Sequence, residues 1–248
     1  MKNMIKEKNK ALLSYEDKDF ISSDAGRIIR ILSEYEMPKY YFKEFNIERT
    51  ITVFGSARQL SNSVANKYPN IAKAYKECET IVDKLLDWSL SLPKEQRYYI
   101  CTGGGPGFME AANKASFDKK VPSLGLNINL PFEQESNKYV NPNLNFEFHY
   151  FFMRKFWFTK LSKALIIMPG GYGTMDELFE NLTLIQTNRT ASKPMVLYNS
   201  DFWYNIFDFK FMEELGFISP EDINLYRICN TPDECVNYLI SELESNTK

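Results

Sequence analysis

Two glycine-rich segments of this chain each stand between a short apolar run and a helical pattern. The first, TGGGPG at 102–107, follows the β-type run 98–101 and precedes a helical pattern at 108–115. The second, PGGYG at 169–173, follows the apolar run ALIIM and precedes a helical pattern at 174–186. A strand that ends in a glycine turn and leads into a helix is typical of a parallel α/β sheet. The sequence therefore predicts an α/β fold.

The rest of the chain continues this alternation, and no repeat, low-complexity tract or linker divides it. We expect residues 23–248 to form a single domain, an open parallel sheet flanked by helices, after a loosely ordered lead-in over 1–22. Further extended segments are expected at 50–54, 123–128, 146–152 and 194–198. Further helices are expected at 24–37 (ended by Pro38), 68–91, 154–163, 202–215 and 232–244.

The balance of charge limits the ligands that the chain can bind. The 248 residues include 30 Lys and Arg against 32 Asp and Glu, a formal net charge of −2. Proteins that bind long nucleic acids need a basic stripe that displaces counterions, and this composition does not favour one. A single small phosphorylated ligand is compatible with it. We therefore expect a small-molecule partner and no nucleic acid.

Metal sites and membrane segments are not indicated. The single histidine, His149, excludes multi-histidine metal sites, and the four cysteines lack C-x-x-C spacing, so no metal is expected. His149 stands among aromatic residues and is expected to have a structural role. The amino terminus has no apolar signal core, and no apolar run is long enough to cross a bilayer. We expect a cytoplasmic protein with reduced thiols and no membrane partner.

Both glycine segments are candidate phosphate sites. The free N–H groups and partial positive charge at a helix N-terminus suit a phosphate, and glycine lets the backbone approach it. Tight packing alone is the competing explanation for each segment. The first lacks the third glycine of G-x-G-x-x-G, and neither is followed by G-K-[ST], which argues against dinucleotides and nucleoside triphosphates. A nucleoside monophosphate or sugar phosphate fits better, with Thr174 as the N-cap of the second helix.

Charged and polar residues near these segments have two interpretations each. Glu177 completes T-x-x-E with Thr174, which is the spacing of a capping box, or it points into the cleft toward a sugar or a water. Arg154 and Lys155 lie in the aromatic run YFFMRKFWF, either on a solvated helix end or beside a phosphate. Ser56 follows the first strand and can reach a ligand, but G-x-S-x-G is absent, so a serine hydrolase is not favoured.

Together these motifs resemble one family. PGGYGTMDE at 169–177 is similar to the P-G-G-x-G-T-x-x-E signature of the LONELY GUY (LOG) proteins, often labelled lysine decarboxylase-like. No local pattern here would seat pyridoxal phosphate, so no cofactor is expected. The resemblance extends in collinear order from about residue 24 to 220. Its other segments are VFGSAR at 53–58, GGGPGFMEAAN at 103–113, GLNINLPFEQ at 125–134, YFFMRK at 150–155 and ELFENLTLIQT at 177–187.

The resemblance implies a Rossmann-like fold with an extra N-terminal helix, as in longer bacterial-type relatives. It also implies hydrolysis of the N-glycosidic bond of AMP or an N6-substituted AMP, which yields free base and ribose 5-phosphate, in a homodimer or larger homo-oligomer. Arg154 and Glu177 are then the expected catalytic pair. The other expected substrate- or phosphate-binding residues are Gly104, Gly105, Gly170, Gly171, Gly173, Thr174, Lys155 and Ser56.

One position departs from the family pattern. Many short members have M-H-x-R-K, and their histidine position is Phe152 here, which puts base-side specificity in question. A non-catalytic nucleotide-binding or sensing protein on the same fold is the alternative function. Product release, measured beside nucleotide binding, separates the two.

Overall fold

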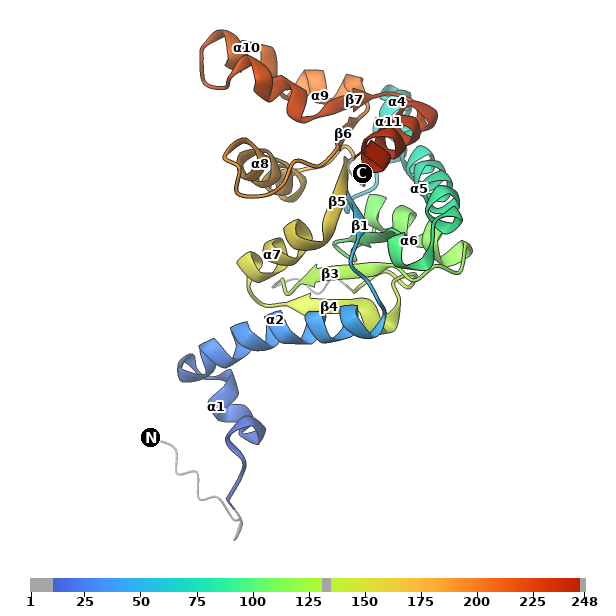
Figure 1. Cartoon of the computed structure of the whole chain (residues 1–248). Coiled ribbons are helices and arrows are strands. Elements are labelled where there is room, and N and C mark those ends of the chain that lie inside the picture. Colours follow the sequence, from blue (N-terminus) through green and yellow to red (C-terminus); the bar gives the residue numbers. More distant parts are fainter. Residues whose placement is uncertain (1–10, 131–134, 246–248) are drawn as a thin grey trace.

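The computed structural model describes residues 11–130 and 135–245 and has one parallel sheet at its centre (Figure 1). Within these residues the sheet has seven strands in the order β4-β3-β2-β1-β5-β6-β7. They are β1 (Thr50–Phe54), β2 (Tyr99–Thr102), β3 (Leu124–Ile128), β4 (Asn145–Phe148), β5 (Ser162–Ile167), β6 (Met195–Tyr198) and β7 (Arg227–Cys229). The chain moves outward from β1 to β4 and then returns past β1 to β5. Ligands bind at such a reversal of strand order, beyond the carboxyl ends of the strands.

Helices cover both faces of the sheet. The described helices are α1 (Lys18–Ser22), α2 (Arg27–Glu44), α3 (Asn62–Lys67), α4 (Pro69–Ala72), α5 (Ala74–Ser91), α6 (Phe108–Asp118), α7 (Phe151–Leu161), α8 (Tyr172–Gln186), α9 (Ser200–Ile206), α10 (Phe209–Glu214) and α11 (Pro232–Ser245). The helices α5, α6 and α11 share one apolar core, whereas α2, α7 and α8 share the other. In β5, Ala164 and Ile166 belong to the first core, while Leu165 and Ile167 belong to the second.

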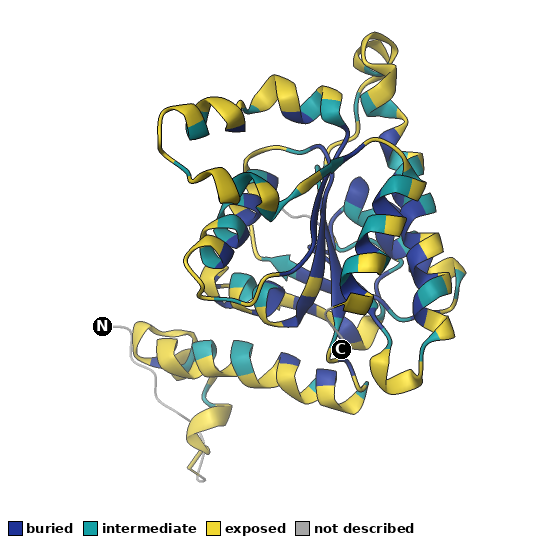
Figure 2. Ribbon diagram, turned by 45° about the horizontal axis from the view of Figure 1, so that its top comes forward, coloured by how far each residue is buried: buried dark blue, intermediate teal, exposed yellow. Residues whose placement is uncertain are grey.

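This double burial explains why β5 and β6 contain continuous apolar runs, whereas the edge strand β4 alternates exposed and buried residues. Figure 2 shows the strands as a buried layer between half-exposed helices. The predicted α/β fold, with an open parallel sheet and an extra N-terminal helix, is confirmed. Among the described residues, no helix is both long and apolar enough to span a bilayer.

The N-terminal helix corrects one prediction, because Pro38 lies inside α2 instead of following its end. Proline has no N–H, so the carbonyl of Glu34, one turn earlier, loses its helical partner. The indole N–H of Trp157 donates to that carbonyl at 3.0 Å. A residue from α7 therefore satisfies the group that Pro38 leaves free, and α2 continues to Glu44.

Glu34 of α2 also determines where α7 begins. The Glu34 carboxylate accepts hydrogen bonds from the backbone N–H groups of His149 (2.7 Å) and Tyr150 (3.3 Å). A carboxylate at a helix start satisfies free donors and complements the helix dipole. The extended segment accordingly ends at Phe148 rather than at 152, and α7 begins at Phe151 rather than at Arg154.

Other boundaries differ in smaller ways. The helix expected at 68–91 is interrupted at Lys73, between α4 and α5. The helix expected at 202–215 is divided, because the Asp208 side chain accepts from Phe211 N–H and begins α10. The three-residue strand β7 was not expected.

Candidate active site

Three loops meet at the carboxyl edge of the sheet where the strand order reverses, and Ser56 joins them. Its N–H donates to the Pro169 carbonyl (3.0 Å), just before the second glycine segment. Its carbonyl accepts from the N–H of Phe108 (3.2 Å), at the start of the helix that follows the first. The Ser56 hydroxyl is taken up locally, as it donates to the Arg58 carbonyl (2.9 Å) and accepts from the Arg58 N–H (3.0 Å). Ser56 is thus a structural link between the two predicted phosphate loops.

The first glycine segment is closely packed. Gly104 has φ +73°, and a Cβ at this position would lie 2.3 Å from Oδ1 of Asn127. A Cβ on Gly103 would lie 2.8 Å from a terminal nitrogen of Arg154. Glycine is needed at Gly104 for its backbone conformation, whereas a Cβ on Gly103 would have to displace the end of the Arg154 side chain. The segment therefore brings backbone directly against the Arg154 guanidinium.

A network of amide side chains holds this segment in place. The Asn137 side chain donates to the carbonyls of Gly104 (3.1 Å) and Gly105 (2.9 Å) and to Oδ1 of Asn113 (3.0 Å). Thr102 donates its hydroxyl to the same Asn113 oxygen (2.7 Å). Gly104 and Gly105 therefore turn their carbonyls toward protein partners. Sequence reasoning missed Asn137, because its loop between β3 and β4 carries no motif that points to it.

The second glycine segment is open where the first is closed. A Cβ on Gly171 or Gly173 would meet nothing within 4 Å, and Tyr172 between them is 96% exposed. Gly171 is the N-cap of α8, and no side chain of the described residues caps that end. The first N–H groups of an uncapped helix are available to an anion. This segment thus has the properties predicted for a phosphate site.

Thr174 was expected as the N-cap of the second helix and Gly170 as a phosphate-binding residue, but the two residues pack against each other. Thr174 is the third residue of α8 and is buried, so the prediction that it caps the helix is wrong. The reason is that Gly170 has no side chain: a Cβ there would lie 2.1 Å from Oγ1 of Thr174. The helix therefore starts earlier, and Thr174 packs back against Gly170.

Glu177 does not form the capping box that its spacing allows. It is the sixth residue of α8 and only 5% exposed, so its carboxyl lies beyond the reach of the helix start. Burial raises the pKa of Glu177 to about 7, although the nearby Arg154 and Lys155 act in the opposite direction. A carboxyl group that titrates near neutrality, in a site at the carboxyl edge of a sheet, is suited to proton transfer and charge stabilisation.

Arg154 is the basic partner of this carboxyl group. Its Nε donates to the carbonyl of Leu126 in β3 (2.9 Å), and its guanidinium lies 5.2 Å from the ring of Phe158. Burial lowers the pKa of Arg154, and the charge of Glu177 opposes that shift. Because α7 begins at Phe151, Arg154 lies in its first turn and its side chain reaches the sheet edge. The predicted pair is therefore brought together.

Lys155 is directed to a different set of partners. Its ammonium forms ion pairs with Asp176 (2.9 Å) and Glu180 (2.5 Å) on α8. These contacts join α7 to α8. They neutralise the Lys155 ammonium group, which was expected to face a phosphate. Phe152, at the family's histidine position, is exposed on α7.

No group of three or more His, Cys, Asp and Glu side chains in the described part of the chain is placed to hold a metal ion. The four cysteines are buried free thiols. The chemistry available at the site is that of one carboxyl group, one guanidinium and the backbone N–H groups of a helix start. Such a set can bind a phosphate and stabilise a developing positive charge.

Comparison with known proteins gives a consistent family. A family model described as "Possible lysine decarboxylase" matches residues 109–239. A probable cytokinin riboside 5'-monophosphate phosphoribohydrolase of Oryza sativa subsp. japonica, LOG4, is 30% identical over 160 residues, which cover 62% of this chain and 67% of that protein. The Arabidopsis thaliana cytokinin riboside 5'-monophosphate phosphoribohydrolase LOG3 is 42% identical over 89 residues, covering 35% of this chain. The matches to LOG3 and to rice LOGL2 span only 40% and 36% of those proteins.

Solved structures show the same fold at low sequence identity. The molybdenum cofactor binding protein from Rippkaea orientalis has a TM-score of 0.51 at 20% identity, covering 81% of this chain and 98% of that one. The structure of TM1055 has a TM-score of 0.50 at 17% identity, covering 78% and 99%. These likenesses concern the fold alone.

Proposed function

The chain belongs to the LOG family, and we propose that it hydrolyses the N-glycosidic bond of a nucleoside 5′-monophosphate, releasing free base and ribose 5-phosphate. The relatives' printed names supply the reaction class. The observation that carries the proposal is the buried Glu177 carboxyl group beside Arg154, on the helix whose open start lies at the carboxyl edge of the sheet.

The distance along α8 from its start to Glu177 can be compared with the size of the substrate. Glu177 follows Tyr172 by five residues, which is about 7.5 Å along the axis at 1.5 Å per residue. Side chains tilt toward the helix N-terminus, so the carboxyl group lies somewhat closer to that end. A 5′-phosphate on the N–H groups of the Gly171–Gly173 turn would place its ribose near Glu177. Phosphate binding then supplies the energy that positions the reacting carbon.

The chemistry follows from this placement. As the C1′–N bond breaks, its electron pair leaves with the base and positive charge develops on the ribose, which the ionised Glu177 carboxylate stabilises. A water oxygen forms the new bond to C1′, and its proton passes by way of Glu177 to the departing base. Arg154 adds the positive charge that keeps part of the Glu177 population ionised near pH 7.

We propose AMP or an N6-substituted AMP as the substrate and a homodimer or larger homo-oligomer as the active form. Exposed aromatic side chains lie on α7 near the site, which supports an interface there. They are Phe151, Phe152 and Phe156.

The test is base release from a panel of nucleoside 5′-monophosphates that includes AMP and N6-isopentenyl-AMP. Chromatography should detect free base and an equal amount of ribose 5-phosphate. Arg154→Ala should abolish release, whereas Arg227→Ala, an exposed arginine on β7, should not change it. Nucleotide binding without release would favour the non-catalytic alternative, and neither binding nor release would refute both.

A further inference from the structure

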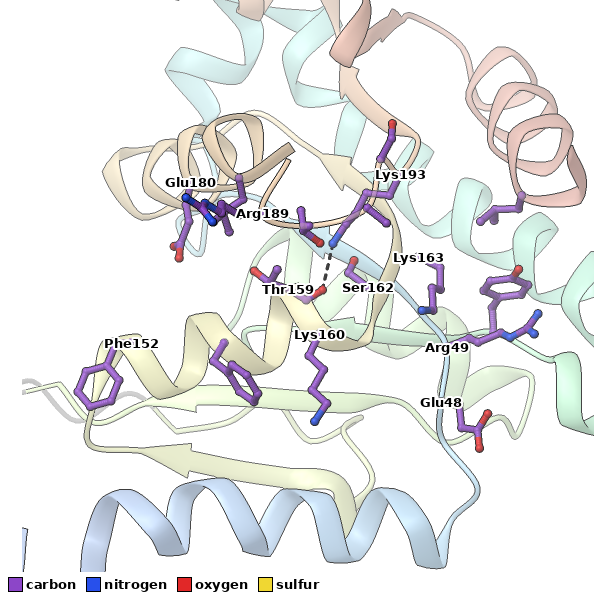
Figure 3. A pocket seen from close by; sticks show the side chains of 17 residues that line it. Glu48, Arg49, Phe152, Thr159, Lys160, Ser162, Lys163, Glu180, Arg189 and Lys193 are labelled. Atoms are coloured by element: carbon purple, nitrogen blue, oxygen red, sulfur yellow. Dashed lines mark hydrogen bonds between the residues drawn. The ribbon is translucent and has the colours of Figure 1, made fainter. Parts of the chain in front are cut away.

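A second cavity lies at the opposite edge of the sheet from the glycine segments. Its volume is about 1030 Å³, and its lining comes from the segments that enter the strands and from the helices α7 and α8 (Figure 3). Arg49 precedes β1, Tyr98 precedes β2 and Lys193 precedes β6, while Ser162 and Lys163 begin β5. None of the described lining residues belongs to the glycine segments or to the Arg154 and Glu177 pair. The cavity is therefore separate from the candidate active site.

Positive charge accumulates in this cavity although the whole chain is slightly acidic. Two acidic residues line it, Glu48 and Glu180, and Glu180 already pairs with Lys155 outside it. Two of the basic side chains lie against aromatic rings, which attract a cation without neutralising its charge. The five basic residues of the lining are Arg49, Lys160, Lys163, Arg189 and Lys193.

Lys193 is the least solvated of these cations. It is 7% exposed, and its Nζ donates to the carbonyl of Thr159 at 3.0 Å. Burial, and then the charge of Lys163, lower the pKa of Lys193 to about 8. No carboxylate in the described part of the chain pairs with either lysine. The charge of Lys163 thus acts on a buried ammonium group that has no carboxylate partner among the described residues.

The end of α7 explains only part of this arrangement. A lysine that binds a carbonyl of the last helical turn complements the negative end of the helix, and Lys193 does so through one of its three N–H donors. That role does not need a second lysine next to it. Figure 3 shows Lys193, Ser162 and Lys163 gathered around the end of α7, on the cavity side.

We propose that this cavity binds a phosphorylated small molecule, with Lys163 and Lys193 holding the phosphate. A divalent anion neutralises both ammonium groups at once, and lysine binds phosphate as a compact point charge. The volume matches that of pockets for ligands up to nucleotide size. Of the aromatic residues in the lining, Tyr98 lies outside the interface proposed above and provides a surface for the organic part of such a ligand.

Calorimetric titration with inorganic pyrophosphate at fixed ionic strength tests the phosphate subsite. Wild type should bind pyrophosphate at the start of α8 and, separately, in this cavity, and Lys163→Gln and Lys193→Met should each weaken the cavity binding at least tenfold. Lys210→Gln, at an exposed lysine on α10, is the matched control and should bind as wild type does. Gly173→Val places a branched side chain at the open start of α8, so it should remove the binding at that helix start and leave the cavity binding in place.

The results that would overturn the proposal are equally specific. They are the absence of binding to wild type, unchanged binding in Lys163→Gln, or loss of all binding in Gly173→Val, which would assign the anion to the glycine segment alone. Lys163 is exposed, so its variant remains informative if circular dichroism shows Lys193→Met to be unfolded. The outcome does not depend on whether the chain hydrolyses nucleotides.

Discussion

Replacement of Glu177 by glutamine should make the protein more stable, although it removes the proposed catalytic carboxyl group. Burial raises the pKa of Glu177 from the ordinary value of 4.5 to about 7 in the folded chain. This difference of about 2.5 pH units, at about 1.4 kcal/mol each, corresponds to about 3 kcal/mol by which ionised Glu177 destabilises the fold. Glutamine resembles the protonated carboxyl group in shape and has no ionised form.

The stability difference between wild type and Glu177→Gln depends on pH in a defined direction. Below about pH 4.5 the carboxyl group of Glu177 is protonated in both states, so the destabilisation is absent. Between about pH 4.5 and 7 the unfolded chain ionises first, and wild type loses stability relative to Glu177→Gln. Above pH 7 the full difference of about 3 kcal/mol is present, or roughly 6–12 °C in Tm for a chain of this size.

Thermal unfolding of wild type and Glu177→Gln, compared from pH 4.5 to 8.5, measures this difference. The exposed Glu214→Gln on α10 is the matched control and should show no growing gap with pH. A Glu177→Gln protein that is less stable than wild type at pH 8 would refute the reasoning. It would mean that the ionised carboxylate stabilises the fold, as a capping residue does.

Two further predictions concern the scaffold of the site. Gly104→Ala should lower the free energy of unfolding, measured in urea, by about 2–4 kcal/mol, because φ +73° disfavours alanine and its methyl group would meet Asn127. Gly171→Ala, with open space around it, should change stability by less than about 1 kcal/mol, and equal losses would contradict the packing argument. Trp157→Phe should lower the free energy of unfolding by about 1–3 kcal/mol, because the Glu34 carbonyl becomes unsatisfied. The loss of the indole hydrogen bond should cost less in Trp88→Phe, because the indole N–H of Trp88 donates to an exposed carboxylate that water can solvate. In the Trp157→Phe background, Pro38→Ala should recover part of the lost stability, because the N–H of residue 38 can then donate to the Glu34 carbonyl. If the effects of the two substitutions on stability simply add, Trp157 does not compensate for Pro38.

Local patterns were sufficient for every strand of the described sheet except β7, and for the two glycine segments. The strands buried on both faces are short apolar runs, and each glycine turn is adjacent to its strand and helix in sequence. The helices α7 and α8, which carry Arg154 and Glu177, flank β5 in the chain, and the two charges act on each other in the structure. Elements that depend on neighbouring residues could therefore be predicted.

The errors arose where a distant residue supplies the missing partner. Pro38 normally ends a helix, but Trp157 satisfies the carbonyl that it leaves free. The start of α7 depends on the carboxylate of Glu34, which no local pattern near 150 contains. In both cases the tertiary contact overrides a sound local preference.

Two residues of the candidate site show the same limit. T-x-x-E has capping-box spacing, yet the absence of a side chain on Gly170 lets α8 start before Thr174 and places Glu177 in its interior. Lys155 stands next to Arg154 in sequence, but acidic residues of α8 take its charge. The spacing of residues predicted which groups gather at the site, and packing decides what each one contacts.

The most direct test of the central claim is the rate of base release by folded wild type and folded Glu177→Gln from the same nucleoside 5′-monophosphate at pH 8. General acid–base catalysis by one side chain contributes roughly 10²–10⁴-fold. Wild type should release base and ribose 5-phosphate in equal amounts, and Glu177→Gln should be slower by at least about 100-fold while unfolding at a higher temperature. A Glu177→Gln protein that releases base at the wild-type rate would contradict the assignment of Glu177 as the catalytic carboxylate.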